Sequence, residues 1–250
     1  MASSDDGVHP VTDGIVRITR AATNCYLVDT PDGPVLIDAG LPRMWSLLRD
    51  ALDAVGLTPD QLVSVYLTHG HFDHVGMADR LVSDHHVPLH VHPDDVALAR
   101  HPYRYAHERA RTRYPFRFPA AVPALARMAM AGALGVHGVD AHGDVRPGVD
   151  VLGGLVPVFS PGHTRGHCGY FLPSRSVLFS GDALVTYDPY TAAKGPRVVA
   201  RAATADVAAA RASLGALAAT GARTVLPGHG TPFTDGVVSA VGLARQAPVP

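Results

Sequence analysis

The amino-acid sequence predicts an α/β protein. Short apolar runs at residues 35–37, 62–67, 156–159 and 224–226 have the length and the β-branched content of buried strands. Each run ends in a turn that carries a histidine or an aspartate, which places polar side chains at strand ends. In residues 45–55, Leu47, Leu48, Leu52 and Val55 recur at helical spacing. The sequence therefore mixes buried strands with amphipathic helices.

The elements are predicted in chain order. The first half should contain strands at 14–20, 24–30, 35–38, 62–67 and 88–91, with helices at 45–55 and 77–83. The second half should contain strands between about 149 and 180, a helix at 204–220, a strand at 224–226 and a helix at 236–247. Asp206 falls in the first turn of the 204–220 helix and Gly221 at its end. No repeat or linker interrupts the chain, so we expect a single domain over residues 1–250.

Residues 68–76 read Thr-His-Gly-His-Phe-Asp-His-Val-Gly and predict a metal site. Within six positions stand four metal-capable side chains, which are His69, His71, Asp73 and His74. Imidazole and carboxylate are ligands that zinc and related divalent ions favour. No single helix face can hold all four, whereas a loop with Gly70 and Gly76 can curl them around a pair of ions. A strand precedes the loop, which is where α/β proteins place their chemistry.

Further metal-capable residues follow apolar runs in the same way. The run at 156–159 leads to Gly-His163-Thr-Arg-Gly-His167, the run at 176–180 to Gly-Asp182, and the run at 224–226 to Gly-His229. Upstream, residues 35–37 lead into Asp38-Ala-Gly. These turns supply the remaining candidates for the site.

An early Asp followed by His-x-His-x-Asp-His, His, Asp and His resembles the metallo-β-lactamase superfamily. The matching positions are Asp38, His69, His71, Asp73, His74, His163, Asp182 and His229, and the resemblance spans residues 23–231. It implies an αββα sandwich. It also implies that His69, His71 and His163 hold one metal, that Asp73, His74 and His229 hold the other, and that Asp182 bridges them. Asp38 and His167 would support these ligands from behind.

Two divalent ions about 3.5–4 Å apart share a hydroxide and lower its pKa, so hydrolysis is the expected reaction. Asp73 and Asp182 are the expected catalytic residues, with Asp73 carrying a proton once the hydroxide is consumed. The cofactor is expected to be two Zn²⁺ ions, because the ligands are rich in nitrogen. Relatives on this scaffold also use manganese or iron.

Residues 93–143 form a long segment between the two halves of the site. Residues 100–118 contain six arginines and five aromatic residues against one glutamate, and an apolar, methionine-containing stretch follows at 120–136. We expect a helical insertion that caps the metal site, with its apolar face around an acyl group and arginines near an anionic part of the substrate. The alternatives are an extension packed on the sandwich and a contact in a homodimer. Tyr187 and Lys194, after the Asp182 turn, are further candidates for substrate contacts.

Composition indicates an ordinary globular enzyme. Hydrophobic residues make up 47% of the chain, charged residues make up 17%, and the formal net charge of −1 indicates neither nucleic acid nor an anionic membrane as partner. The opening stretch, residues 1–7, lacks the basic and apolar regions of a secretory signal. Cys25 and Cys168 do not form a CxxC pair. We therefore expect a cytoplasmic protein with two reduced, buried thiols.

The leading functional hypothesis is hydrolysis of an ester-type carbonyl in a small molecule with an apolar or acyl part, such as a thioester or a lactone. The alternative is a phosphodiesterase or nuclease on the same dinuclear site, because arginines and aromatic side chains also suit nucleic acid. A diiron oxidoreductase is disfavoured by His71, where those relatives carry an acid. A binding module without activity should have lost ligands, and none is missing.

Overall fold

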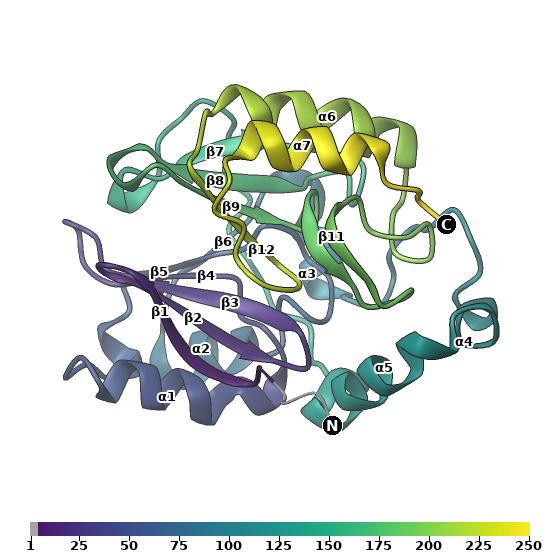
Figure 1. The fold of residues 1–250 in the computed structure, drawn as a ribbon. Coiled ribbons are helices and arrows are strands. Elements are labelled where there is room, and N and C mark those ends of the chain that lie inside the picture. The colour runs from purple at the N-terminus through teal and green to yellow at the C-terminus, as the bar shows by residue number, and fades with distance from the viewer. Residues whose placement is uncertain (1–4) are drawn as a thin grey trace.

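The computed structural model describes residues 5–250 and confirms an α/β sandwich with the order helices, sheet, sheet, helices (Figure 1). Of the opening stretch 1–7, on which the expected absence of a secretory signal rests, residues 1–4 lie outside the described part. Within the described residues, no helix is long and apolar enough to span a membrane.

The first sheet has six strands in the order of the chain. They are β1 (Gly7–Thr12), β2 (Ile15–Arg20), β3 (Thr23–Val28), β4 (Val35–Ile37), β5 (Ser64–Tyr66) and β6 (Leu89–His90). Strands β1 to β4 pair antiparallel, and β4, β5 and β6 pair parallel. Helices α1 (Trp45–Asp53) and α2 (Ala78–His85) cover the outer face of this sheet, at the bottom of Figure 1.

The second sheet has four strands in the order β12-β9-β8-β7. They are β7 (Val156–Phe159), β8 (Cys168–Leu172), β9 (Val177–Gly181) and β12 (Thr224–Pro227), and only the β12–β9 pair is parallel. Helices α6 (Val207–Ala219) and α7 (Val237–Gln246) cover its outer face (Figure 1). Asp206, expected in the first turn of the helix that corresponds to α6, is the N-cap of α6 and accepts a hydrogen bond from the Ala209 N–H at 2.9 Å.

Three apolar clusters hold the layers together, one between the sheets and one beneath each helix pair. The cluster between the sheets includes Tyr26 and Phe179, whose ring centroids lie 5.3 Å apart in an edge-on arrangement. Cys25 and Cys168 are both buried and free, as expected. The two sheets pack face to face through this cluster. Strand ends from both sheets therefore lie along one edge of the sandwich.

Three strands escaped the sequence analysis, namely β1 and the hairpin of β10 (Val185–Asp188) with β11 (Ala193–Arg197). Strand β1 lies at the edge of its sheet and contains Pro10. The hairpin carries a glycine and a proline in β11 and forms a separate two-stranded sheet. Their sequences lack a continuous apolar run because neither element is buried on both faces.

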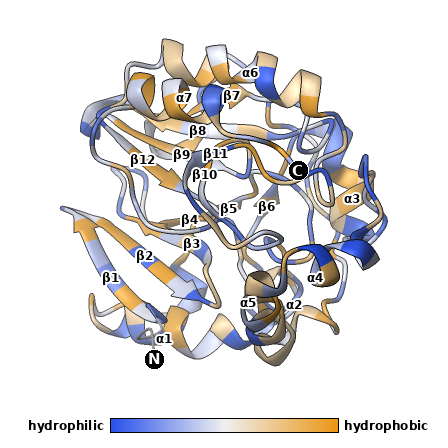
Figure 2. Cartoon of the chain, turned by 45° about the vertical axis from the view of Figure 1, so that its right-hand side comes forward, coloured by the Kyte–Doolittle hydropathy of each residue, from blue (hydrophilic) through white to orange (hydrophobic). Residues whose placement is uncertain are grey.

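The insertion expected at 93–143 contains the short helices α3 (Val96–Arg100), α4 (Tyr114–Arg117) and α5 (Val122–Met128), followed by a π-helical turn at Ala129–Ala133. Figure 2 shows the hydrophilic ribbon around α4 beside the more hydrophobic α5. Met128, Ala131 and Val136 join the core beneath the first sheet. A Cβ on Gly132 would lie 3.1 Å from Pro42. The buried side of the apolar stretch therefore packs on the sandwich and does not form an acyl pocket.

Candidate metal centre

The histidine-rich loop leaves β5 and turns back before α2. Glycine is required twice in this loop because the chain passes very close to neighbouring backbone. A Cβ on Gly70 would lie 2.5 Å from the backbone nitrogen of Ala99, and a Cβ on Gly76 would lie 2.4 Å from the Gly40 carbonyl oxygen. These close approaches fix the path of the loop between its two ends.

The seven predicted ligands come together at the edge where the two sheets meet. They form three overlapping groups, whose members each offer one atom within 4.8 Å of the others: His69, His71 and His163; His69, His74 and Asp182; Asp73, His74 and His229. All seven side chains are buried. The loop after β5 supplies four of them, and turns of the second sheet supply His163, Asp182 and His229.

Asp38 lies behind the cluster and orients the first sheet's ligands. Its carboxylate accepts hydrogen bonds from the Thr68 N–H at 2.7 Å and from the Thr68 hydroxyl at 2.9 Å. It also contacts His74 Nδ1 at 2.8 Å, so Nδ1 donates a hydrogen bond to the carboxylate and Nε2 points into the cluster, 3.5 Å from Asp182 Oδ1. Asp38 adopts a φ of +59°, which is uncommon for a non-glycine residue. Asp38 thus contacts His74 and the residue that precedes His69, and its supporting role stays a prediction.

His167 positions Asp182 through the backbone. Its Nε2 accepts a hydrogen bond from the Asp182 N–H at 3.1 Å, and its Nδ1 lies 2.8 Å from the Ser160 hydroxyl. Both ring nitrogens are thus engaged, and no lone pair is left for a metal. His167 is buried next to the candidate ligands, and its supporting role stays a prediction.

Asp95 is a structural contributor that the sequence analysis missed. Its buried carboxylate accepts hydrogen bonds from the Gly70 N–H at 3.1 Å, the Gly166 N–H at 2.8 Å and the Thr164 hydroxyl at 2.7 Å. It therefore ties the loop of His69 and His71 to the turn of His163. Asp95 follows Pro93 in an unremarkable polar turn, and nothing local in the sequence distinguishes it from Asp94.

The cluster contains buried polar atoms that have no hydrogen-bond partner within the described chain. They are His69 Nε2, His71 Nε2, His74 Nε2 and Asp182 Oδ1. Leaving a buried polar atom unpaired costs about 1–3 kcal/mol. Four such atoms in one cluster of imidazole and carboxylate groups fit a site for divalent cations.

The histidines of the cluster differ in pKa, so some are neutral and others are charged at neutral pH. Burial lowers the pKa of His71 to about 3 and that of His163 to about 3, so both are neutral ligands at neutral pH. Burial also disfavours the charged form of His229, but Asp182 and Asp73 outweigh it and raise the pKa of His229 to about 10. Burial opposes ionisation of Asp182, but His229 and His74 hold its pKa well below the usual range.

A small cavity of about 10 Å³ lies directly against the cluster, with His71, Asp73, Asp182 and His229 among its lining residues. Tyr105 from the insertion and Tyr190 from the β10–β11 turn line it as well. Their hydroxyl groups lie 3.0 Å apart. The Tyr105 ring centroid lies 4.2 Å from that of His71. The insertion thus covers the site through an aromatic residue that the sequence analysis did not single out.

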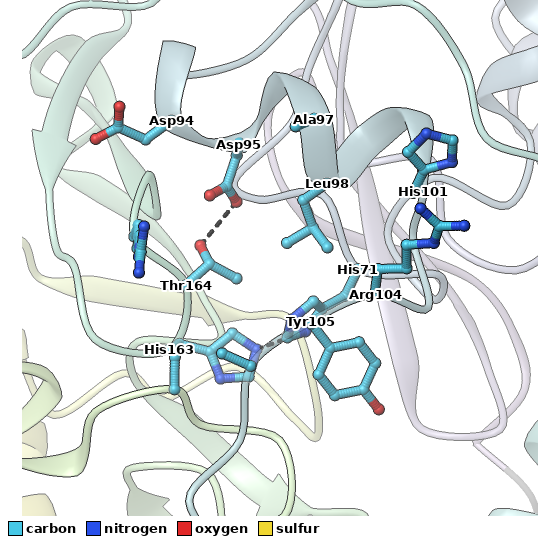
Figure 3. Close-up of a pocket in the computed structure, with 13 residues that line it drawn as sticks. His71, Asp94, Asp95, Ala97, Leu98, His101, Arg104, Tyr105, His163 and Thr164 are labelled. Atoms are coloured by element: carbon cyan, nitrogen blue, oxygen red, sulfur yellow. Dashed lines mark hydrogen bonds between the residues drawn. The ribbon is translucent and has the colours of Figure 1, made fainter.

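A larger groove of about 330 Å³ opens on the other side of His71 and His163 (Figure 3). Its walls include Leu98 of α3 and Tyr105, and its polar residues include Arg104. Figure 3 also shows Asp95 joined to Thr164 beside the groove. A volume of about 330 Å³ is large enough for a small molecule next to two of the candidate ligands.

Tyr187 and Lys194, the predicted substrate contacts, line a different cavity. This cavity of about 600 Å³ also includes Arg127 and Gly230, and none of the seven candidate ligands lines it. Tyr190 occupies the position facing the cluster, because the β10–β11 hairpin turns that residue inward. Asp188 fixes the turn by accepting a hydrogen bond from the Tyr190 N–H at 2.9 Å.

Comparisons with known proteins agree with this geometry. The family model of the metallo-beta-lactamase superfamily matches residues 18–229. The probable metallo-hydrolase YflN of Bacillus subtilis (strain 168) is 29% identical over 239 residues, which cover 88% of this chain and 85% of YflN. An N-acyl homoserine lactonase of Bacillus thuringiensis is 26% identical over 187 residues, which cover 66% of this chain and 62% of the lactonase.

Among solved structures, TTHA1623 in a di-iron-bound form aligns with a TM-score of 0.59 and 30% identity, over 90% of this chain and 96% of that protein. The family match runs from within β2 to His229 and therefore covers all seven candidate ligands and Asp38. The chain therefore belongs to the metallo-β-lactamase superfamily and is a metal-dependent hydrolase.

Proposed function

We propose that this enzyme hydrolyses an ester-type carbonyl in a small molecule with an apolar or acyl part, such as a thioester or a lactone. The groove at His71 and His163 is the observation that carries this proposal. Four of its lining residues are small or aliphatic, namely Ala97, Leu98, Ala106 and Ala205. Arg104 and Arg165 supply charge for a polar end of the substrate. A short acyl group fits beside the cluster in such a groove.

In this proposal, His69, His71 and His163 would hold one metal and Asp73, His74 and His229 would hold the second, with Asp182 close to ligands of both groups. The two ions would supply Lewis acidity and lower the pKa of water. The Asp73 carboxylate lines the small cavity and takes up a proton from the attacking water, which it then passes to the leaving group. The buried cavity excludes bulk water from this transfer.

The names of the relatives support an acyl substrate. The N-acyl homoserine lactonase is a lactone hydrolase by name, and it shares 26% identity over its aligned region. For the metal, the nitrogen-rich ligand set favours zinc, whereas the di-iron form of TTHA1623 makes iron the alternative. Elemental analysis of protein purified without added metal distinguishes the two.

A phosphodiesterase activity is the second candidate. Arg109, Arg113 and Arg117 share one groove near the insertion's α4 helix, and arginines suit phosphate. The formal net charge of −1 argues against a polymeric nucleic-acid substrate.

The test is turnover of metal-loaded enzyme on medium-chain acyl thioesters, acyl lactones, a chromogenic β-lactam and bis-(p-nitrophenyl) phosphate. We expect acyl turnover that disappears in Asp73→Ala and persists in Asp140→Ala, a change at an exposed aspartate that pairs with Arg100. Chain-length preference in the acyl series would measure the depth of the groove. Turnover of the phosphodiester alone would refute the acyl proposal.

Tyr105→Phe and Tyr190→Phe are expected to lower kcat by about ten- to a hundred-fold, because each removes a hydroxyl that faces the cluster. Burial raises the pKa of both phenols, so both remain protonated donors at neutral pH. Steady-state kinetics on the best acyl substrate give the measurement. Tyr103→Phe, whose hydroxyl instead bonds the Ala133 carbonyl, is the matched control. Equal losses in all three variants would assign the effect to packing of the insertion.

Metal binding is expected to release protons at pH 8. In the metal-free protein His229 carries a proton, because its pKa is raised to about 10, and a ligating imidazole must lose it. Calorimetric titration with Zn²⁺ in buffers of different ionisation enthalpy counts the released protons. The same raised pKa stabilises the metal-free fold, fully so below the ordinary histidine pKa of 6.5, and this contribution is lost as the pH rises through about 10. Zinc affinity that is independent of pH over this window would contradict the assignment.

A further inference from the structure

The six arginines of residues 100–117 have different environments. Arg100 pairs with Asp140 at 2.6 Å. Arg111 lies over the ring of Tyr105, 4.4 Å from its centroid. Arg104 lines the groove beside the metal-ligand cluster. The other three, Arg109, Arg113 and Arg117, form no ion pair with any carboxylate in residues 5–250.

These three arginines line one groove of about 680 Å³ together with Arg201. We call it the arginine groove. Its other lining residues are Ala110, Tyr114, Phe118, Val249 and Pro250, and none of its lining side chains is acidic. The neighbouring Glu108, the only glutamate of the chain, is already engaged. It pairs with Arg201 and accepts a hydrogen bond from the Val207 N–H at 2.7 Å.

The arginine groove therefore holds three guanidinium groups, those of Arg109, Arg113 and Arg117, that no acidic side chain in residues 5–250 pairs with, whereas Arg201 is paired with Glu108. Arg113 precedes α4 and Arg117 ends it, four residues apart, which is a spacing at which like charges on a helix repel one another. A bound polyanion would reverse this repulsion. Guanidinium groups bind phosphate oxygens in bidentate geometry, which makes phosphate a better match than a single carboxylate.

Two aromatic side chains, Tyr114 and Phe118, line the same groove. Phe118 is half-buried, and the Arg117 guanidinium lies 5.7 Å from its ring centroid. Tyr114 packs edge-on against Tyr190 with centroids 6.0 Å apart, so one aromatic layer separates the arginine groove from the cavity at the metal-ligand cluster. A planar heterocycle can stack on such a surface, which adds affinity of about 1–3 kcal/mol per base.

We propose that the arginine groove binds a nucleotide-like small molecule that carries at least two phosphate groups. Arg109, Arg113 and Arg117 contact the phosphates, and Phe118 stacks on the base. A volume of about 680 Å³ lies within the range of small-molecule sites. The near-neutral net charge of the whole chain favours a small ligand over a nucleic-acid strand. This binding does not depend on the proposed hydrolytic activity.

The experiment is calorimetric titration of the metal-loaded protein with ADP, adenosine, pyrophosphate and a single-stranded oligonucleotide at physiological salt. We expect ADP to bind more tightly than pyrophosphate, and adenosine to bind weakly or not at all. The double variant Arg113→Ala/Arg117→Ala should weaken ADP binding by about tenfold or more. Phe118→Ala should reduce the affinity for ADP to that for pyrophosphate.

The matched control is Arg49→Ala/Arg223→Ala, which removes two exposed arginines that do not line the groove, one in α1 and one directly before β12, and changes the net charge equally. An equal loss of binding in both double variants would overturn the proposal in favour of diffuse electrostatic attraction. Unchanged ADP affinity in Arg113→Ala/Arg117→Ala would place the nucleotide elsewhere, including at the metals. Tighter binding of the oligonucleotide than of ADP would overturn the proposal and show that the groove binds nucleic acid. Unfolding temperatures of all variants verify that each retains its fold.

Discussion

Asp182→Asn is expected to abolish acyl hydrolysis and to leave fewer than two metals bound. The Asp182 carboxylate lies 3.2 Å from His229 Nε2, 3.5 Å from His74 Nε2 and 3.5 Å from His163 Nε2. Within residues 5–250, it is therefore the only acid that lies within 4 Å of ligands from both groups. Its loss removes a negative charge from the centre of a buried cationic site. Losing a partner of a ligand costs roughly 10- to 100-fold in affinity or activity, and we expect a larger loss here.

Metal content by elemental analysis and initial rates at saturating zinc provide the two readouts. Asp140→Asn applies the same chemical change to an exposed carboxylate and should preserve both. Asp182→Asn protein that keeps two metals and more than a tenth of the rate would show that the bridging role is wrong.

Asp95→Ala is expected to lower stability and metal affinity together, although Asp95 binds no metal in our assignment. The change leaves the Gly70 N–H, the Gly166 N–H and the Thr164 hydroxyl without their acceptor in a buried position. We expect a loss of about 3 kcal/mol in the free energy of unfolding. For a chain of this size, that corresponds to a fall of roughly 6–12 °C in Tm.

Zinc affinity should also fall by roughly 10- to 100-fold, because the loops of His71 and His163 are no longer held together. Asp94→Ala is the matched control, since Asp94 occupies the same short turn but is exposed. Calorimetry of the metal-free and zinc-loaded proteins separates the two effects. If Asp95→Ala lowers Tm while zinc affinity stays unchanged, then Asp95 stabilises the fold without positioning the ligands.

The sequence was most informative where a metal-capable side chain directly follows a predicted strand. Metal-capable side chains after short apolar runs predicted the seven-residue cluster, because a strand end fixes the direction in which the next turn leaves the sheet. Asp95 could not be distinguished from Asp94 in the sequence, because its role depends on donors from Gly70 and Gly166, which are distant in the chain.

The insertion was the least predictable part for the same reason. Its composition suggested a single cap over the metal site, whereas its residues contribute to three separate parts of the structure. Tyr105 covers the metal-ligand cluster, Met128 packs into the core beneath the first sheet, and Arg113 lines the arginine groove. Helical periodicity reports which side chains share a face, but it does not report which neighbour that face meets. Likewise, the sequence favoured Tyr187 over Tyr190 on the same loop, whereas the β10–β11 hairpin turns Tyr190 toward the cluster and Tyr187 toward another cavity.

The division of the ligands between the two sheets has a consequence for biosynthesis. Each proposed metal needs a residue from the second half of the chain, His163 for one and His229 for the other. Before the second sheet is synthesised, the nascent chain offers only the loop after β5, which cannot complete either set. Neither set can therefore select its metal until the turns of the second sheet have been made. The ions present once both halves have folded together would decide which metal the enzyme carries.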